Sequence, residues 1–351
     1  MIETWLPSEI VGSVTDVTII IVSYNVRDLL IQCLDSIHEA AQTHRYDVIV
    51  VDNASVDGSV DAVRQRFPLV SVIESPQNLG FGAALNRVSN LARGCYLLLL
   101  NPDAILGTAA IDRLVDTLDE RSDAAIVGPR LRFPNGIVQS SRRRFPTPLT
   151  ALVESTVIQQ WRPGLRPLEN YVVADMPDQF QEVDWLVGAC LLVRRSVFQA
   201  VGGFDERFTM YSEELDLCRR IQGLGWKIVF DPRAEVVHYE GRSSERNQAR
   251  RGQQFSESKS RFFEKYYGPR VGLALRVVLL ANTVYLLAEE AVKMVLGHRV
   301  RLRQQRIAAL GVVAHDQAIR LFQRVTGAPC EYSPVVQTEP ESSSTAGRIR
   351  A

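Results

Sequence analysis

A chain of 351 residues is long enough for one large domain with additional segments, or for two domains. With 46% hydrophobic and 23% charged residues, its composition excludes a disordered chain, a collagen-like repeat and a polytopic membrane protein. Lys+Arg and Asp+Glu both number 40, but residues 1–240 carry 31 acidic and 22 basic residues, whereas residues 241–351 carry 9 and 18. The acidic first part argues against a nucleic-acid-binding protein.

Cysteine spacing and the lack of targeting segments indicate the compartment. The five cysteines lie far apart without a CxxC pair, which argues against a zinc knuckle or a disulfide framework. Residues 1–12 lack the charge and apolar pattern of a signal peptide. In the apolar segment 271–297, the uncharged run 277–288 is too short to cross a bilayer. We therefore expect a cytoplasmic protein.

The first hundred residues alternate short β-branched runs with helical stretches, which is typical of βαβ units and a parallel sheet. The wholly apolar run at 96–100 is expected of a central strand that is buried on both faces. The pattern predicts strands at 17–22, 47–51, 69–73 and 96–100, and helices at 27–40 and from the glycine loop 78–82 to about residue 93.

After residue 129 the pattern becomes less regular. The proline-rich stretch 146–182 is predicted to be a variable loop over the site. Beyond it, the sequence predicts one strand-like run at 184–193, a helix at 210–220 and a short strand at 227–230, which the segment 236–241 follows closely.

Polar residues follow the predicted strands. In open α/β sheets ligands bind at the carboxyl ends of the strands, so Tyr24, Asp52, Asn53 and Asp103 should converge there. A carboxylate that closes a hydrophobic strand is costly when unpaired, which favours a functional role for Asp52 and Asp103. Ser55, in contrast, is predicted to cap the following helix.

Several motifs are absent. There is no GxxxxGK[ST] motif, which excludes a P-loop, and the Gly80-Phe81-Gly82 loop does not complete GxGxxG. A serine-hydrolase GxSxG elbow is also missing. The remaining pattern is a strand-end aspartate, an acidic cluster about 110 residues later and then a histidine, which suits a divalent cation with a general base.

Six motifs stand in order along the sequence, at residues 22–25, 51–59, 78–82, 101–103, 202–206 and 211–217. Together they resemble the motifs of the family-two glycosyltransferases, and most closely those of the bacterial rhamnosyltransferase branch. The resemblance implies a GT-A fold, that is, an α/β, Rossmann-like and mostly parallel sheet flanked by helices. It also implies a nucleoside-diphosphate sugar donor and an inverting transfer. Beyond the matched region we expect a helical C-terminal extension.

The resemblance also implies which residues bind the donor. The first two strand ends hold the nucleoside in the family, and the glycine loop and the Asp-x-Asp position complete the donor site. The residues implied are Ser23, Tyr24, Asn25, Asp52, Asn53, Asn78, Gly80, Phe81, Gly82 and Asn101.

The implied cofactor is Mg²⁺ or Mn²⁺, bound on the donor diphosphate by the Asp-x-Asp motif. Here the first position of the motif is Asn101, so that only Asp103 keeps a carboxylate. This is consistent with one direct ligand plus substrate oxygens and waters, which is how Mg²⁺ usually binds. His238, in a segment that resembles the late His-x-x-Gly motif, is either a further ligand or a surface or phosphate-contacting residue.

The acceptor hydroxyl loses its proton as it attacks the anomeric carbon, so a carboxylate base is required. Glu214 aligns with the family's usual base and Asp216 with a supporting acid, and the role is left open among Glu213, Glu214 and Asp216. The alternative is a solvated acidic helix start that the macrodipole favours.

The last third is basic and contains the interrupted apolar segment 271–297. Such a segment is typical of an amphipathic helix in a membrane interface, and a homo-oligomeric interface is the rival explanation. We expect peripheral attachment at the inner face of the plasma membrane, near a glycan or lipid-linked acceptor. The predicted organisation is an extension at 1–15, the GT-A domain at 16–245, a basic helical region at 246–330 and a disordered tail at 331–351.

The expected function is therefore transfer of a sugar, with rhamnose as one candidate, in cell-envelope polysaccharide synthesis. Two alternatives stay open. A sugar nucleotidyltransferase should carry a glycine-rich, arginine-containing loop after its first strand, where Ser23-Tyr24-Asn25 stands instead. A non-catalytic glycan-binding or scaffold protein would tolerate loss of the acidic residues.

Overall fold

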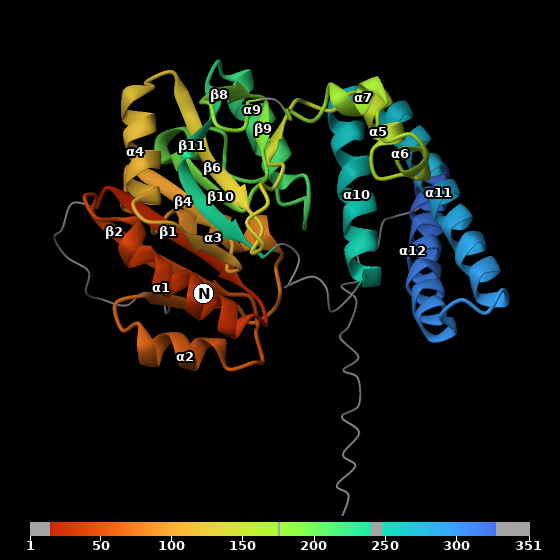
Figure 1. Ribbon diagram of the computed structural model, residues 1–351, viewed down its shortest axis with the longest axis horizontal. Coiled ribbons are helices and arrows are strands. Elements are labelled where there is room, and N and C mark those ends of the chain that lie inside the picture. The colour runs from red at the N-terminus through yellow and green to blue at the C-terminus, as the bar shows by residue number, and fades with distance from the viewer. Residues whose placement is uncertain (1–14, 175, 240–247, 328–351) are drawn as a thin grey trace, which may run out of the picture.

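The computed structural model describes residues 15–174, 176–239 and 248–327. An α/β part and a bundle of three long helices make up the described chain (Figure 1). The predicted N-terminal extension and disordered tail fall almost entirely outside the described residues.

A nine-stranded sheet forms the centre of the α/β part, in the order β3-β2-β1-β4-β10-β6-β11-β5, with β8 also paired to β11. β10 is antiparallel to β4 and β6, and β5 and β8 are antiparallel to β11, while the remaining pairs are parallel. The predicted mostly parallel sheet is confirmed. The strands are β1 Val17–Ser23, β2 Tyr46–Asp52, β3 Ser71–Glu74, β4 Tyr96–Leu100, β5 Ala104–Leu106, β6 Ala124–Arg132, β7 Arg142–Arg143, β8 Gln181–Val183, β9 Trp185–Leu186, β10 Cys190–Arg194 and β11 Lys227–His238.

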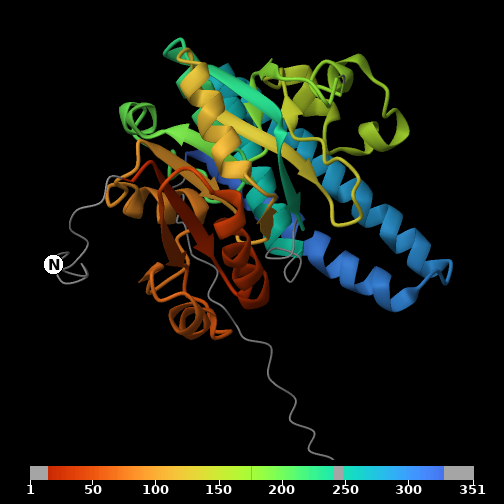
Figure 2. The ribbon, with the colours of Figure 1, turned by 60° about the vertical axis from the view of Figure 1, so that its left-hand side comes forward.

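Helices cover both faces of this sheet. One face buries apolar residues against α1 and α4, which lie over it side by side (Figure 2). The other face packs against α3, α8 and α9. The helices are α1 Arg27–Ala40, α2 Ser59–Arg66, α3 Phe81–Ser89, α4 Ala110–Glu120, α5 Pro148–Val153, α6 Val157–Trp161, α7 Arg166–Glu169, α8 Arg195–Ala200, α9 Glu213–Gly223, α10 Gln248–Tyr267, α11 Pro269–Val295 and α12 Val300–Thr326.

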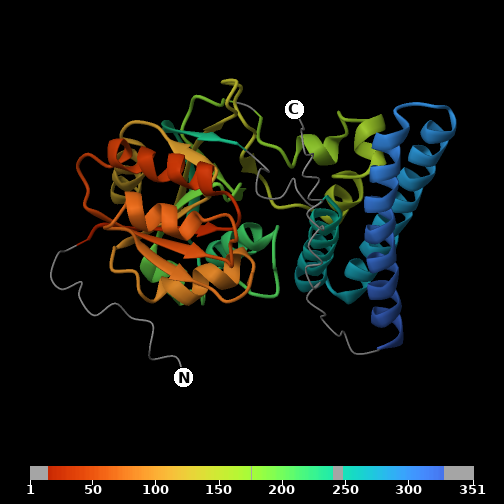
Figure 3. The same cartoon turned by 90° about the horizontal axis from the view of Figure 1, so that it is seen from below.

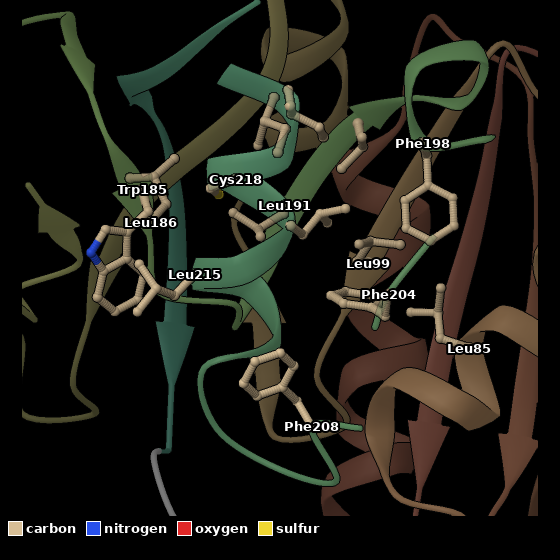
Figure 4. Close-up of a cluster of buried hydrophobic side chains, with 14 of the residues drawn as sticks. Leu85, Leu99, Trp185, Leu186, Leu191, Phe198, Phe204, Phe208, Leu215 and Cys218 are labelled. Carbon is tan, nitrogen blue, oxygen red and sulfur yellow. The ribbon is translucent and has the colours of Figure 1, made fainter. Parts of the chain in front are cut away.

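The core under α9 fixes the position of that helix. Leu215 and Cys218 of α9 pack with Leu191 of β10. Phe204 and Phe208, which precede α9 in the chain, belong to the same buried cluster (Figure 4). Burying a side chain of this size contributes roughly 1.5–3 kcal/mol. The start of α9 is thereby held against the sheet.

The three long helices share a core with the α/β part. α10 buries Phe262 and Phe263 in the same cluster as α9, and α11 adds Leu275 and Leu279. Figure 3 shows α10 between the sheet and the hairpin of α11 and α12. The expected helical C-terminal extension is therefore present and packs directly on the sheet domain.

One described helix, α11, is long and apolar enough by length and composition to cross a membrane. Its most apolar window has a mean hydropathy of 1.9 and is 22% buried within the protein. Arg276 and Glu290, which interrupt the apolar sequence, form ion pairs with Glu257 of α10 and Arg303 of α12. These two charges in the apolar segment are thus neutralised by partners on the neighbouring helices.

Three expectations for the less regular part were wrong. The run 184–193 is broken at Val187–Ala189 into β9 and β10, which belong to different sheets. The short strand expected at 227–230 is part of a longer one, β11, which continues to His238 with a register shift between Asp231 and Glu235. The stretch 146–182 forms α5, α6 and α7 and docks on α11, where Trp161 contacts Tyr285 edge to face at 5.5 Å.

Candidate active site

Two buried oxygens lie at the carboxyl ends of β1 and β2. Ser23 and Asp52 pair in register, and both are buried. The Asp52 Oδ2 atom accepts a hydrogen bond from the Ser55 amide at 2.9 Å, but Asp52 Oδ1 and Ser23 Oγ have no partner within the described structure. Buried polar atoms without partners are uncommon, so both oxygens are available to a ligand. Tyr24 follows them and is half-buried.

The turns after these two strands are tied together. The Asn25 amide donates to Ser55 Oγ at 2.9 Å, and Asn25 Oδ1 accepts from the Val56 amide at 2.8 Å. The prediction that Ser55 caps α2 was therefore wrong. That helix begins at Ser59, and Asp57 Oδ1 accepts from the Ser59 amide instead.

The side chain of Asn53 shapes the glycine loop. Its Nδ2 atom donates to Asn78 Oδ1 at 3.1 Å and to the Gly80 carbonyl at 3.2 Å, and its Oδ1 accepts from the Leu79 amide at 2.9 Å. These bonds occupy both polar atoms of the Asn53 side chain, which could otherwise bind the sugar donor. Asn53 and Asn78 therefore hold the loop from within.

The glycine loop in turn packs against the chain that precedes α9. Gly80 has φ +83°, and a Cβ there would lie 2.5 Å from the Thr209 carbonyl oxygen, so only glycine fits. Gly82 and Phe81 both contact Phe204, with the two phenyl rings 5.7 Å apart. The predicted donor loop and the acidic helix are thus one packed unit.

Asp103 and His238 meet because β5 pairs with β11. The pairing places His238 opposite Ala104, and His238 Nε2 lies 3.4 Å from Asp103 Oδ1, with both side chains buried. The other ring nitrogen, Nδ1, is 3.0 Å from Oε1 of Gln139. The predicted pair of metal-binding residues is therefore adjacent, although 135 positions separate the two residues in the sequence.

Asn101 lies on the same turn as Asp103. Its backbone amide donates to the Ala189 carbonyl at 2.9 Å, and its half-buried side chain makes no hydrogen bond to the described residues. Within the described ranges, no group of three or more His, Cys, Asp or Glu side chains is arranged to hold a metal ion. If a metal binds here, Asp103 and His238 can supply two protein ligands but not a complete cage.

The acidic pair begins α9 after an unusual backbone segment. Tyr211 and Ser212 have φ values of +69° and +64°, a region that non-glycine residues seldom occupy. Two successive left-handed residues store strain, and such strain is found at functional sites. The turn delivers Glu213 and Glu214 to the first turn of the helix.

Both glutamates keep one buried oxygen, Oε2, that has no partner among the described residues. Burial raises the pKa of Glu213 well above its ordinary value, and the neighbouring Glu214 carboxylate adds to that increase. Burial also raises the pKa of Glu214, although hydrogen bonds from backbone amides, including that of Gly188, partly offset the increase. The pair thus holds a proton to higher pH than an exposed glutamate does.

The segment that contains Gly188 joins the acidic pair to the turn of Asn101 and Asp103. A Cβ at Gly188 would lie 3.4 Å from Cβ and Cγ of Glu214, and the carbonyl of the next residue, Ala189, accepts from the Asn101 amide. Glu214 and Asn101 are therefore connected through two consecutive residues. This connection could not be predicted, because the sequence 184–193 is typical of one continuous strand.

Asp216 points to the opposite environment. It is fully buried and accepts hydrogen bonds from Arg220 Nε at 2.7 Å, Lys265 Nζ at 2.5 Å and the Tyr266 hydroxyl at 2.8 Å. Lys265 also binds Asp205 at 2.8 Å. Asp216 therefore links α9 to α10, a role that the sequence did not reveal because its partners lie about fifty residues away.

Arg219, which precedes Arg220 on α9, lies among aromatic rings. The Arg219 guanidinium lies 4.4 Å from the ring centre of Tyr266 and 5.2 Å from that of Phe145. Arg220 is held by Asp216 and by the Val201 carbonyl. Both arginines thus serve the packing of α9.

Family models match most of the described chain. The model of glycosyl transferase family 2 matches residues 18–202, and the model of glycosyl transferase family group 2 matches residues 153–288.

Among curated relatives, the chain is similar to an N-acetylglucosaminyl-diphospho-decaprenol L-rhamnosyltransferase of Mycobacterium tuberculosis, with 35% identity over 217 residues. That match covers 58% of this chain and 69% of the relative. The rhamnosyltransferase WbbL of Escherichia coli is 28% identical over 231 residues, which cover 64% of this chain and 83% of the relative.

Among solved structures, the chain is similar to a mannosyltransferase from Pyrobaculum calidifontis in complex with GDP-Man and Mn²⁺. The TM-score is 0.50 and the sequence identity 18%, over 89% of this chain and 88% of that one. This likeness concerns the fold, which is the GT-A fold that the motifs implied. The chain belongs to glycosyl transferase family 2 and is a glycosyltransferase of the kind that builds cell-envelope polysaccharides.

Proposed function

We propose that this enzyme transfers rhamnose, with inversion, from a nucleoside-diphosphate donor to a lipid-linked glycan acceptor. The observation that carries the proposal is the buried acidic pair Glu213–Glu214, whose partnerless oxygens lie beside the carboxyl edge of the sheet. Support for the sugar comes from the rhamnosyltransferases to which the chain is similar, one of which is named for a decaprenol-linked substrate.

The donor nucleoside is proposed to bind at the ends of β1 and β2. Asp52 Oδ1 is an unpaired buried acceptor that fits the N–H or O–H donors of a base or ribose, and Ser23 Oγ can donate or accept. Tyr24 and Asn25 border these groups. Asn53, Asn78, Gly80, Phe81 and Gly82 would act indirectly, because they define the loop beside the donor.

Asp103 and His238 are the residues that would hold a divalent metal. The two side chains are chemically suited to this role, because a carboxylate oxygen and an imidazole nitrogen can both bind Mn²⁺ and the two groups are already in contact. Two protein ligands leave positions for diphosphate oxygens and waters, as is usual for Mg²⁺ as well. When bound, the ion would neutralise the charge that develops on the leaving diphosphate. The Mn²⁺-bound mannosyltransferase with this fold supports this proposal.

The acceptor hydroxyl is proposed to give its proton to the acidic pair, with Glu214 as the base and Glu213 as a neighbour that is still protonated when Glu214 ionises. A raised pKa brings a carboxylate closer to the pH at which it works, which improves a general base. Asp216 is proposed to position the helix, since all its contacts are to α9 and α10.

Membrane attachment is proposed through the hairpin of α11 and α12. At its tip, Val295 and Leu296 are 82% and 67% exposed, and exposed arginines at 299 and 301 follow them. Apolar side chains beside cations suit the interface of a bilayer with anionic lipids. The double variant Val295→Glu, Leu296→Glu should float less with anionic liposomes than the wild type, whereas Leu69→Glu, at an exposed site on the sheet domain, should not. Equal flotation of all three would contradict attachment at the tip, and loss of a dimer on sedimentation would indicate a subunit interface.

The transfer itself is tested by a donor screen. Thermal shift with deoxythymidine-diphosphate-rhamnose and other nucleotide sugars, with Mn²⁺ or Mg²⁺, should find one donor that stabilises the fold as its occupancy rises. Rhamnose should then appear on a polyprenyl-diphosphate acceptor with inverted anomeric configuration. Retention of configuration, or stabilisation by other sugar nucleotides alone, would contradict the proposal.

A further inference from the structure

Gln139 is a buried amide at the carboxyl edge of the sheet, directly behind His238. Its backbone amide donates to the Leu131 carbonyl at the end of β6 at 2.8 Å, which fixes the residue. Its side chain is 6% exposed and places Oε1 3.0 Å from His238 Nδ1. Gln139 follows the exposed turn at 133–136 and belongs to no motif, so that its sequence context predicts no role.

With the Gln139 amide in this orientation, the contact fits a hydrogen on Nδ1 of His238. A neutral imidazole has one N–H group, and Oε1 of an amide can only accept. If Nδ1 donates to Gln139, then Nε2 presents a bare lone pair to Asp103 Oδ1, 3.4 Å away. Two acceptors that face each other in a buried site are stabilised by a cation between them.

We propose that Gln139 is a positioning residue that holds His238 in the Nδ1–H tautomer, so that Nε2 and Asp103 together bind a divalent cation. The inference rests on the metal site of the proposed function. Residues that orient a metal-binding histidine typically change metal affinity about 10–100-fold when replaced. In the opposite orientation the Gln139 amide would donate to Nδ1, so that the hydrogen of His238 would lie on Nε2. Nε2 would then donate to Asp103 and could not bind a metal.

The tautomer is tested first, and without metal. ¹⁵N NMR of the metal-free protein, with the His238 signals assigned from a His238→Gln variant, should show the hydrogen on Nδ1. Hydrogen on Nε2 would overturn the inference whether or not the protein binds a metal.

Metal affinity provides the second readout. Mn²⁺ titrations followed by electron paramagnetic resonance should show Gln139→Leu weaker by about 10–100-fold, and Gln139→Glu, which can still accept from Nδ1, close to the wild type. Gln317→Leu, a buried glutamine of α12 that binds Ser256, is the matched control and should bind Mn²⁺ normally. Wild-type affinity in Gln139→Leu would overturn the inference alone, whereas no Mn²⁺ binding by the wild type would overturn the metal site of the proposed function as well.

Discussion

The two ends of the first turn of α9 place the same chemical group in opposite environments. Glu213 and Glu214 keep partnerless buried oxygens, and burial raises the pKa of both. Asp216, two residues on, is saturated by Arg220, Lys265 and Tyr266. A carboxylate that lacks partners is available for chemistry, whereas one that is fully paired is structural.

The contrast also shows how the fold maintains an unfavourable arrangement. The strained turn at Tyr211 and Ser212 and the unpaired acids both cost stability. Asp216 offsets this by joining the helix to α10 through Lys265. The helical extension therefore supports the acidic pair, in addition to any contact with a membrane.

The largest expected effect is on activity. Glu214→Gln keeps the shape of the side chain but removes the base, so transfer should fall by about 10²–10⁴-fold. Stability at neutral pH should stay equal or rise, because a buried ionisable group is removed. Initial rates and thermal melting on the same preparation measure both. A fully active variant would assign the base elsewhere.

The opposite face should give the opposite pattern. Asp216→Asn leaves the cation of Lys265 with a poorer partner in a buried site, and the free energy of unfolding should drop by about 3–5 kcal/mol. The folded enzyme should keep most of its kcat. Asp231→Asn is the matched control, since Asp231 is equally buried and paired with Arg233 away from the site. If Asp216→Asn melts like the wild type, the anchoring role is wrong.

The packing of the glycine loop on the segment before α9 can be separated from backbone strain. Gly80→Ala should weaken donor binding and destabilise the fold by about 1–3 kcal/mol, because φ is +83° and the new Cβ meets the Thr209 carbonyl. Gly136→Ala carries a similar φ of +81° with open space around it, so it measures the strain alone. Equal effects of the two variants on donor affinity would contradict the coupling.

The smallest expected effect is on the pH dependence of stability. The folded pKa of Glu213 is raised, so below the unfolded value of about 4.3 both states are protonated and there is no penalty. As the pH rises from there to the folded pKa, the unfolded state releases its proton first and stability falls, by at most about 1.4 kcal/mol per pH unit for one proton. Glu213→Gln should flatten this part of the urea-denaturation profile. An unchanged slope would place the raised pKa elsewhere.

Much of the first half could be predicted because local patterns determine it. The apolar run 96–100 and the helix 27–40 have the bounds that the sequence predicts, and the parallel pairing follows from their alternation. The resemblance named Asp103 as a metal ligand and His238 as a candidate for a second, and the pairing of β5 with β11 brings the two side chains together. These features depend on periodicity and on chain order.

The remaining features depend on long-range packing. Gly188 interrupts an apolar run that reads as one strand, because the chain must turn past Glu214. The role of Asp216 could not be separated from that of Glu214, since Lys265 reaches it from another helix. Gln139 carries no motif at all, and only the folded sheet edge brings it to His238.

The pH profile of kcat tests most directly the claim that the acidic pair is the base. The account predicts that kcat falls on the acidic side with an apparent pKa above that of an ordinary glutamate. It also predicts that Glu213→Gln leaves this limb in place, because Glu213 has the more strongly raised pKa and is still protonated, and therefore uncharged, when Glu214 ionises. Asp216→Asn should leave the limb in place as well. An acidic limb at the ordinary glutamate value, or one that moves with Asp216→Asn, would contradict the account.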